Sequence, residues 1–182
     1  MSDLTGKKIA FLLTNGYEDS ELTSPWEAVT AAGAAATLVS PESGSIEGKK
    51  GHTQGVDLAS ASADAADFDA LVLPGGVVNA DHLRTDTDSV RFTRAFFDAG
   101  KPVGVICHGA WILADAGVLD GRRITSYPSL RTDLGNAGAN WVDEEVVVDQ
   151  GLVSSRTPDD LPAFNAKLVE EFAEGVHEGQ TA

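Results

Sequence analysis

The chain has little of what marks several large classes of protein. One cysteine in 182 residues excludes an intramolecular disulfide and gives no sign of an oxidising compartment. No apolar run approaches the roughly 20 residues that a membrane-spanning helix needs. The opening stretch MSDLTGKKIAFLL lacks the layout of a signal peptide, because its apolar run is short and leads directly into strand-like sequence. We therefore expect a cytoplasmic protein that makes no use of a membrane.

Basic residues are scarce too: 13 Lys and Arg stand against 28 Asp and Glu, which gives a net charge of −15. A surface of that sign repels the phosphates of nucleic acids, so we expect no nucleic-acid binding. The acidic surplus fits an ordinary acidic enzyme, and it also fits a chain adapted to high salt. The sequence predicts no metal site, because its histidines are scattered without an i, i+4 pair: His52, His82, His108 and His177.

The chain does contain a regular alternation of short apolar runs and amphipathic stretches. Strands are predicted at residues 7–13, 35–40, 68–76, 101–107 and 122–126, with a hairpin at 145–155 and turns or a small hairpin at 41–57. Helices are predicted at residues 20–32, 88–100, 108–117, 129–138 and from Thr157 to about residue 175. This alternation indicates right-handed βαβ units and a mostly parallel sheet. We expect an α/β fold that forms a single domain over residues 1–182, with a frayed tail from about residue 175.

Three turns leave predicted strands at the carboxyl edge of this sheet, where the ligands of open α/β sheets collect. Their sequences are NGYEDSE, PGGVVNADHL and CHGAW. In the third, Cys107 ends an apolar strand and begins a helix, which is the arrangement of a nucleophile elbow with Cys in place of Ser. Gly109 lets the two backbones approach closely and is expected to take part in substrate binding, and the helix N-terminus favours the thiolate. We therefore interpret Cys107 as a reactive thiol rather than as a buried structural cysteine.

The residues around Cys107 have more than one interpretation. Gly75 and Gly76 either offer backbone N–H groups to an oxyanion, together with the N–H of His108, or form a tight turn that needs a positive φ. Of the two glycines, Gly76 is the better donor candidate. His108 either acts as the base for Cys107 or contributes only its backbone N–H, because adjacent residues at an elbow rarely face each other.

The turn GYEDSE supplies three carboxylates: Glu18, Asp19 and Glu21. A carboxylate beside Cys107 makes physical sense only in its protonated form, because an anion would oppose the thiolate. The protonated acid could donate to sulfur and later move a proton. Asp19 and Glu21 are interpreted as solvated acids at a helix start, where they suit the helix dipole.

Five stretches, in this order, resemble the ThiJ/PfpI superfamily and, within it, the PfpI-like branch of intracellular proteases and deglycases. They are KKIAFLLTNGYEDSEL, ALVLPGG, KPVGVICHG, NAGANWVDEEVVVD and LVSSRTPDDLPAF, and together they span nearly the whole chain. The resemblance implies a flavodoxin-like three-layer sandwich related to class I glutamine amidotransferases. It implies Cys107 as the nucleophile and Glu18 as the acid that contacts it. The oxyanion site that it implies consists of Gly75, Gly76 and the N–H of His108.

The resemblance also implies a homo-oligomer, at least a dimer. In such assemblies an acidic residue after the Gly-Gly turn reaches the His of a neighbouring subunit, and Asp81 in VVNADHLR is the best match, although some relatives carry Glu there. Asp81 would then orient His108 across the interface. The chain departs from the pattern at Ala110, where many relatives carry Pro, which removes no reacting group.

Several activities are compatible with these residues. The leading hypothesis is a stress-protective, cofactor-free enzyme that acts on a small carbonyl compound or a glycated protein or peptide, as a glutathione-independent glyoxalase or a deglycase. One alternative is a PfpI-type cysteine peptidase, and another is a redox-sensing stress protein or chaperone that uses oxidation of Cys107. A small polar pocket would favour carbonyl chemistry, and a long cleft would favour peptide hydrolysis. A glutamine amidotransferase is disfavoured, because the downstream His-x-Glu pair of that class is replaced by RTPDDLP.

Overall fold

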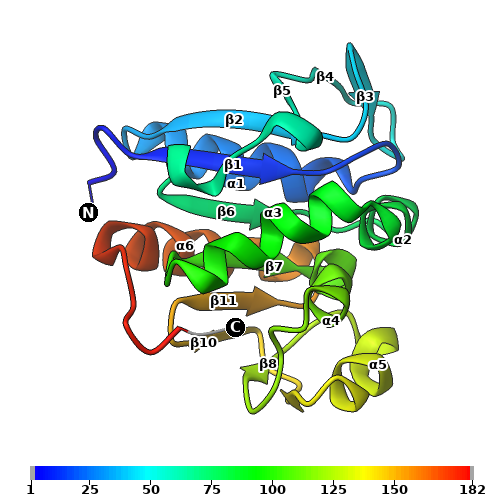
Figure 1. The fold of residues 1–182 in the computed structure, drawn as a ribbon, viewed down its shortest axis with the longest axis vertical. Helices are drawn as coiled ribbons and strands as arrows, with labels where there is room; N and C mark the ends of the chain where they lie inside the picture. The colour runs from blue at the N-terminus through cyan, green and yellow to red at the C-terminus, as the bar shows by residue number, and fades with distance from the viewer. Residues whose placement is uncertain (1–2, 181–182) are drawn as a thin grey trace.

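The computed structural model describes residues 3–180, which form three layers: a central sheet with helices on both faces (Figure 1). The sheet has seven strands in the order β10-β11-β7-β6-β1-β2-β5. β10 and β11 pair antiparallel, and all other neighbouring strands pair in parallel. In spatial order the strands are Val146–Asp149, Leu152–Ser155, Val103–Ile106, Ala70–Leu73, Lys8–Leu12, Ala35–Ser40 and Leu58–Ala59. The predicted α/β fold with a mostly parallel sheet is confirmed.

The helices divide between the two faces of the sheet. α1 packs against α6 on one face, whereas α2, α3 and α4 pack against one another on the other face (Figure 1). The helices are α1 Asp19–Ala31, α2 Val77–Thr85, α3 Thr87–Asp98, α4 Ile112–Ala116, α5 Arg131–Asn136 and α6 Leu161–Glu174. Two small sheets lie outside the central one: β3 Ser45–Glu47 with β4 Thr53–Gly55, and β8 Arg123–Ile124 with β9 Asn140–Trp141. β3 and β4 form the small hairpin predicted within residues 41–57.

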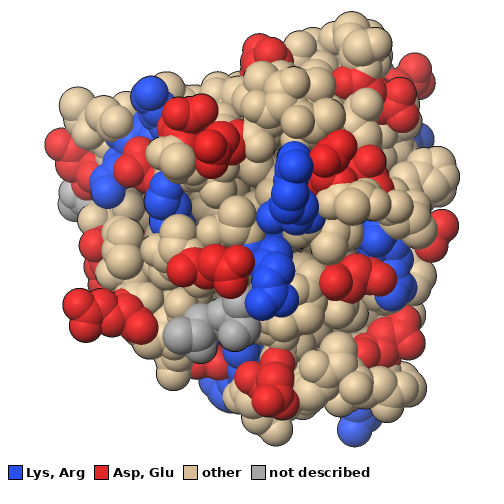
Figure 2. Space-filling view, viewed as in Figure 1, with Lys and Arg blue, Asp and Glu red and all other residues tan. Residues whose placement is uncertain are grey.

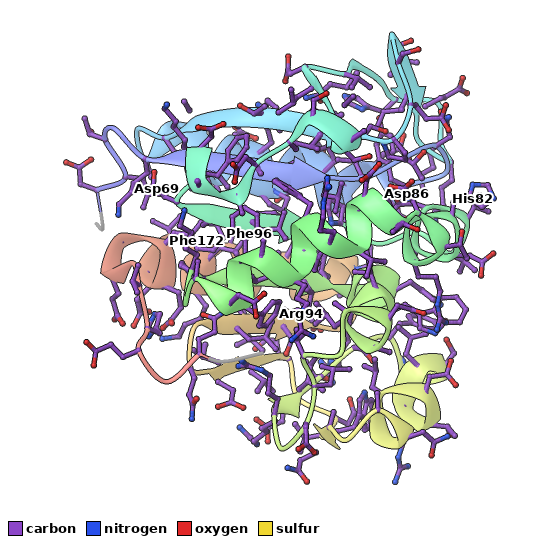
Figure 3. The ribbon with its side chains drawn as sticks, viewed as in Figure 1. Asp69, His82, Asp86, Arg94, Phe96 and Phe172 are labelled. Carbon is purple, nitrogen blue, oxygen red and sulfur yellow. The ribbon has the colours of Figure 1, made fainter. Side chains whose placement is uncertain are left out.

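The central strands are apolar throughout because both of their faces are covered. In β1, Ala10 and Leu12 join the core beneath α3 and α4, and Ile9 and Phe11 join the core beneath α1 and α6. Successive side chains of a strand point to opposite faces, so one continuous apolar run serves both cores. Figure 3 shows the same division for two aromatic side chains, with Phe96 on α3 and Phe172 on α6.

Helix α2 was not predicted. The helix predicted at 108–117 is a 3-10 helix followed by a short α-helix. The first two residues of α2, Val77 and Val78, are 54% and 52% exposed, so apolar periodicity does not reveal this helix. After β7 the chain forms a 3-10 helix, Cys107–Trp111, before the short α4. This tighter turn brings the residues after Cys107 close beneath the sheet edge.

The end of the described chain runs back along the sheet. After α6 ends, the His177 N–H donates to the Gly100 carbonyl at 2.8 Å, and the Gln180 N–H donates to the His177 carbonyl. The last two residues of the predicted frayed tail, 181–182, lie outside the described residues. No helix within residues 3–180 combines the length and apolarity needed to cross a bilayer.

The charged side chains are spread over the surface rather than gathered in one patch. Figure 2 shows Asp and Glu scattered across one face, with Lys and Arg beside many of them. Several of these neighbours are ion pairs, such as Arg84 with Asp115 at 2.7 Å. On this face, the acidic surplus therefore does not mark a single binding surface.

Candidate active site

The three turns singled out in the sequence meet at one edge of the sheet. The arrows of β1, β6 and β7 all point toward the edge where α2 lies (Figure 1). A pocket of about 270 Å³ opens there. Its lining combines all three turns with a lysine from the β3–β4 loop and two residues from later segments: Glu18, Glu21, Lys49, Gly76, Val77, Cys107, His108, Tyr127 and Pro158.

Cys107 sits at a strained elbow between β7 and the 3-10 helix. Its φ of 59° lies in the left-handed region, where only Cys107 and Gln150 lie among the described non-glycine residues. Such a conformation costs on the order of 1–3 kcal/mol and persists where the surroundings over-determine it. Gly109 is required by packing, because a Cβ there would collide with the Leu73 carbonyl oxygen. The structure therefore places Gly109 behind the elbow and not in the pocket lining, in contrast to the substrate-binding role expected of it.

Glu21, not Glu18, is the acid that contacts Cys107. Glu21 has no exposed surface, its Oε2 accepts a 2.8 Å hydrogen bond from the Gly75 N–H, and its carboxyl lies beside the Cys107 thiol, whose pKa its charge raises. Burial raises the pKa of Glu21 to about 7, and the nearby charge of Glu18 adds to the shift. The prediction that Glu21 is a solvated helix-start acid is wrong, because the Gly75-Gly76 turn covers the start of α1.

Glu18 lies in the same pocket lining but belongs to a different set of contacts. It is 4% exposed, and its two carboxylate oxygens contact the ammonium groups of Lys49 and Lys50, the latter at 2.7 Å. Burial by itself would raise the pKa of Glu18, but hydrogen bonds from the two lysines outweigh burial and hold the pKa below its ordinary value. Glu18 is therefore an ionised partner of two cations, which contradicts its predicted role as the protonated acid on sulfur.

The imidazole of His108 does face the neighbouring cysteine. Its Nδ1 lies 3.2 Å from Sγ of Cys107, and its Nε2 lies 3.1 Å from Oγ of Ser129. The ring stacks on Tyr127 with centroids 4.7 Å apart. Burial lowers the pKa of His108, and the charge of Lys49 lowers it further, so the ring is neutral near pH 7 and Nδ1 can accept a proton. Ser129 carries no signal in the sequence that points to this contact.

Asp81 lies apart from this cluster within the chain. It is an exposed residue of α2 and does not line the pocket. His82, next to it, points away from the body of the molecule at the right-hand edge of Figure 3. The contact expected of Asp81 lies in a second subunit, and it stays a prediction.

The backbone donors near the sulfur are Gly76 and His108. The N–H groups of both residues hydrogen bond to Cys107 and oppose the rise of its pKa. Gly75 is not available for this purpose, because its N–H is taken by Glu21. Of the predicted oxyanion donors, the structure therefore brings Gly76 and the His108 N–H to the sulfur and assigns Gly75 to Glu21.

The resting thiol is protonated. Burial raises the pKa of Cys107 to about 12, and the negative charge of Glu21 contributes to the rise. Burial therefore opposes the thiolate that the helix start was expected to favour, and the backbone N–H groups of Gly76 and His108 act in the expected direction. A nucleophile forms here only as a neighbour takes the proton, and the acceptors in contact are Nδ1 of His108 and the carboxylate of Glu21.

Away from this pocket, the described residues include one further group of metal-ligand type. Donor atoms of Glu171, Glu174 and His177 lie within 4.8 Å of one another at the end of α6. His177 also bonds to Gly100 just before β7, so this group lies at the amino edge of the sheet, opposite Cys107. Nε2 of His177 lies 3.3 Å from Oε2 of Glu171.

Comparison with known proteins gives consistent matches over nearly the whole chain. The DJ-1/PfpI family matches residues 7–171. General stress protein 18 of Bacillus subtilis is 50% identical over 163 residues, which cover 88% of this chain and 94% of that protein. Protein/nucleic acid deglycase 2 of Escherichia coli is 48% identical over 166 residues, which cover 90% and 96%.

A solved structure agrees with these matches. A two-domain protein from Anabaena variabilis with DJ-1/ThiJ/PfpI-like and ferritin-like domains superimposes with a TM-score of 0.89 at 31% identity, over 97% of this chain and 50% of that one. None of these comparisons supports the high-salt interpretation of the acidic composition, which stays a prediction.

Proposed function

The chain belongs to the DJ-1/PfpI family, and we propose that it is a cysteine-dependent enzyme that acts on reactive carbonyls, as a deglycase or a glutathione-independent glyoxalase. One observation carries the proposal: the Cys107 thiol lies between an imidazole nitrogen at 3.2 Å and a buried carboxyl whose pKa is about 7. A general acid–base group works best when its pKa is near the operating pH. The E. coli relative named as a deglycase supports the same chemistry.

In the proposed reaction, sulfur adds to the aldehyde carbon of an α-oxoaldehyde while Nδ1 of His108 takes the thiol proton. The carbonyl π electrons move to oxygen, where the N–H groups of Gly76 and His108 support the developing charge and Glu21 supplies a proton. Glu21, now a carboxylate, removes the C–H proton of this adduct and returns it to the neighbouring carbonyl carbon, while the hydroxyl proton of the adduct passes to the oxygen of that carbonyl. The result is a thioester of a 2-hydroxy acid. Water then releases the 2-hydroxy acid and restores the thiol, so the net change is the addition of one water.

The size of the pocket favours a small substrate. Its volume of about 270 Å³ lies just under the roughly 300–1,000 Å³ of sites that enclose drug-sized ligands. A small dicarbonyl, or a single glycated side chain, fits such a volume. A peptide backbone with side chains on both sides of the scissile bond needs a longer cleft, so peptide hydrolysis is the less favoured alternative.

The proposal is tested by measuring lactate formed from methylglyoxal without glutathione, at low and at molar salt. We expect turnover in the wild type, none in Cys107→Ser and a severe loss in Glu21→Gln. Glu27→Gln is the matched control, because Glu27 is an exposed acid on the same helix, and it should leave turnover unchanged. If the wild type makes no lactate but cleaves fluorogenic peptides through Cys107, the carbonyl proposal is overturned in favour of the peptidase.

The proposal includes a homo-oligomer in which Asp81 approaches His108 of a second subunit. The exposed Val77 and Val78 support it, because these apolar side chains stand on α2 beside the pocket, on the same helix as Asp81. Sedimentation analysis of the wild type and of Val78→Lys tests it. A wild type that sediments as a monomer would rule out the assembly.

A further inference from the structure

Lys49 brings a positive charge into a pocket otherwise lined by acids, apolar groups and a neutral imidazole. Among the described residues that line the pocket, it carries the only ammonium group. It lies on the loop between β3 and β4, and its side chain is 52% exposed although its ammonium group contacts Glu18. An ammonium group has three donors, so two remain for a ligand once Glu18 has accepted one.

Lys49 and Lys50 share one carboxylate at this place, and the further acids beside them are Glu21 in the pocket lining and Asp19, which accepts from the Lys50 N–H. Glu18 carries one negative charge, and Lys49 and Lys50 both contact it, so the three side chains together carry one positive charge. Glu18 stays ionised because the lysines lower its pKa, and the hydrogen bond to Glu18 raises the pKa of Lys49. The combined sign of these three side chains is the opposite of the net charge of −15 on the whole chain.

The charge of Lys49 acts at the reacting groups themselves. It lowers the pKa of the His108 imidazole, and the charge of Glu21 in turn raises the pKa of Lys49. Attraction between unit charges falls with distance and with exposure to water. Lys49 also lines the same pocket of about 270 Å³ as Cys107 and His108, so its ammonium group can meet an anionic group of a molecule bonded to Cys107.

We propose that Lys49 makes this pocket a binding site for small 2-oxo acids, whose carboxylate is attached to the carbon that sulfur attacks. Sulfur forms a bond to the carbonyl carbon, the π electrons move to oxygen, and the thiol proton completes the hydroxyl group through His108 and Glu21. The carboxylate is unchanged and pairs with the ammonium group of Lys49. This adduct lacks the second carbonyl that the proposed turnover needs, so 2-oxo acids compete with α-oxoaldehydes. The competition rests on the proposed function, whereas the carboxylate contact does not.

Alkylation of Cys107 tests the contact without any need for turnover. Iodoacetate and iodoacetamide both place a CH₂ group on sulfur as iodide leaves, and they differ in carrying a carboxylate or a neutral amide next to that carbon. Cys107 is the only cysteine in the chain, so intact-mass spectrometry reports this one reaction. The ratio of the two rates cancels changes in thiol ionisation and access, and it isolates the preference for the carboxylate.

We expect the iodoacetate-to-iodoacetamide ratio to fall on the order of tenfold in Lys49→Met and to recover partly in Lys49→Arg. Lys50→Met is the matched control, because it removes the same charge from the same Glu18 outside the pocket lining, and it should change the ratio by less than about twofold. Glyoxylate should slow alkylation by iodoacetamide in the wild type and not in Lys49→Met. An unchanged ratio in Lys49→Met, or an equal fall in Lys50→Met, overturns the proposal.

The alkylation test of the carboxylate site can succeed or fail independently of the lactate test of the proposed function. A Lys49-dependent ratio in a protein that makes no lactate supports the carboxylate site and removes the carbonyl turnover. Lactate formation with a ratio that does not depend on Lys49 keeps the turnover and removes the carboxylate site.

Discussion

Glu18 and Glu21 lie one helical turn apart at the start of α1, both are buried, and both line the same pocket. Their surroundings differ in depth and in charge. Two ammonium groups contact Glu18, whereas Glu21 accepts from a backbone N–H and lies beside a thiol. Burial is the largest cause that raises the pKa of Glu21 to about 7, whereas the two lysines outweigh burial at Glu18 and hold its pKa below the ordinary value. The charge of a carboxyl group is therefore set by its burial together with the charge of its neighbours.

The two acids therefore have different roles in the pocket. An acid that stays ionised fixes cations in place, and an acid that titrates near neutrality moves protons. Glu18 accordingly holds Lys49 at the pocket, and Glu21 is suited to give and take protons at Cys107.

Replacing each acid by its amide should have the largest effect and tests directly whether Glu18 and Glu21 have different roles. We expect Glu21→Gln to lower kcat/KM for methylglyoxal by about 10²–10³, because general acid–base groups contribute on that order and an amide cannot transfer the proton. Glu18→Gln should lower it by less than about tenfold, since the reacting groups remain. A larger loss in Glu18→Gln than in Glu21→Gln would reverse the assignment.

The pH dependence of stability should separate the two acids by sign. The folded-state pKa of Glu21 is about 7 against an ordinary 4.5, so the folded state binds this proton more tightly. Its contribution to the free energy of unfolding is therefore greatest below pH 4.5 and falls by about 3 kcal/mol as the pH rises through 7. Glu18 has a lowered folded-state pKa, so its contribution is present above the ordinary pKa and is lost as the pH falls.

Urea unfolding at about pH 3, about pH 5 and about pH 7.5 measures both contributions. Relative to the wild type, Glu21→Gln should gain stability between the two higher pH values, and Glu18→Gln should lose stability between the two lower ones as the pH rises. Parallel pH profiles for the two variants would mean that the two carboxyl groups do not differ in ionisation.

Gly75→Ala should disturb Glu21 and leave Glu18 in place. A Cβ at position 75 would collide with Oε2 of Glu21 and lie 2.8 Å from Cβ of Cys107. Crowding of this kind costs about 1–3 kcal/mol of unfolding free energy. Gly135→Ala is the control, because a Cβ there meets nothing within 4 Å, and it should be neutral or slightly stabilising. Chemical denaturation of both variants tests this, and equal stabilities would show that the Gly75 turn has room to move.

Lys50→Met should have the smallest effect. The Lys50 side chain is 65% exposed, and Glu18 keeps Lys49 as a partner when Lys50 is removed. Exposed ion pairs contribute about 0–1 kcal/mol, so we expect a change in Tm of a few degrees at most. A much larger loss would show that Glu18 needs both cations to stay ionised.

The sheet and most helices were predictable because local pattern decides them. The apolar run at residues 101–107 contains β7, and the helix predicted at 20–32 corresponds to α1, Asp19–Ala31. The pattern fails in α2, where the polar Asn79 is buried together with Ala80 and Leu83. The Asn79 amide accepts from the Thr14 N–H at 2.7 Å and donates to the carbonyls before the helix. Hydrogen bonds formed across the fold therefore join hydrophobic packing in placing this helix.

The site was predictable only where one short segment contains the whole feature. Cys107 could be found because strand, thiol and glycine are adjacent in the sequence. Glu21 was misassigned because its burial comes from a turn more than fifty residues later, whose N–H it accepts. Lys49 reaches the pocket, and Ser129 reaches the ring of His108, from segments with no motif of their own, so their roles depend on tertiary packing alone.

The contact between Glu18 and Lys49 has a consequence for an enzyme that admits aldehydes. A neutral lysine amine condenses with an aldehyde to form an imine and water. A lysine in this pocket would therefore be modified by an aldehyde substrate if its amine were neutral. The hydrogen bond to Glu18 raises the pKa of Lys49, and the ammonium form has no lone pair with which to attack. Glu18 thereby protects the pocket from glycation by the compounds it receives.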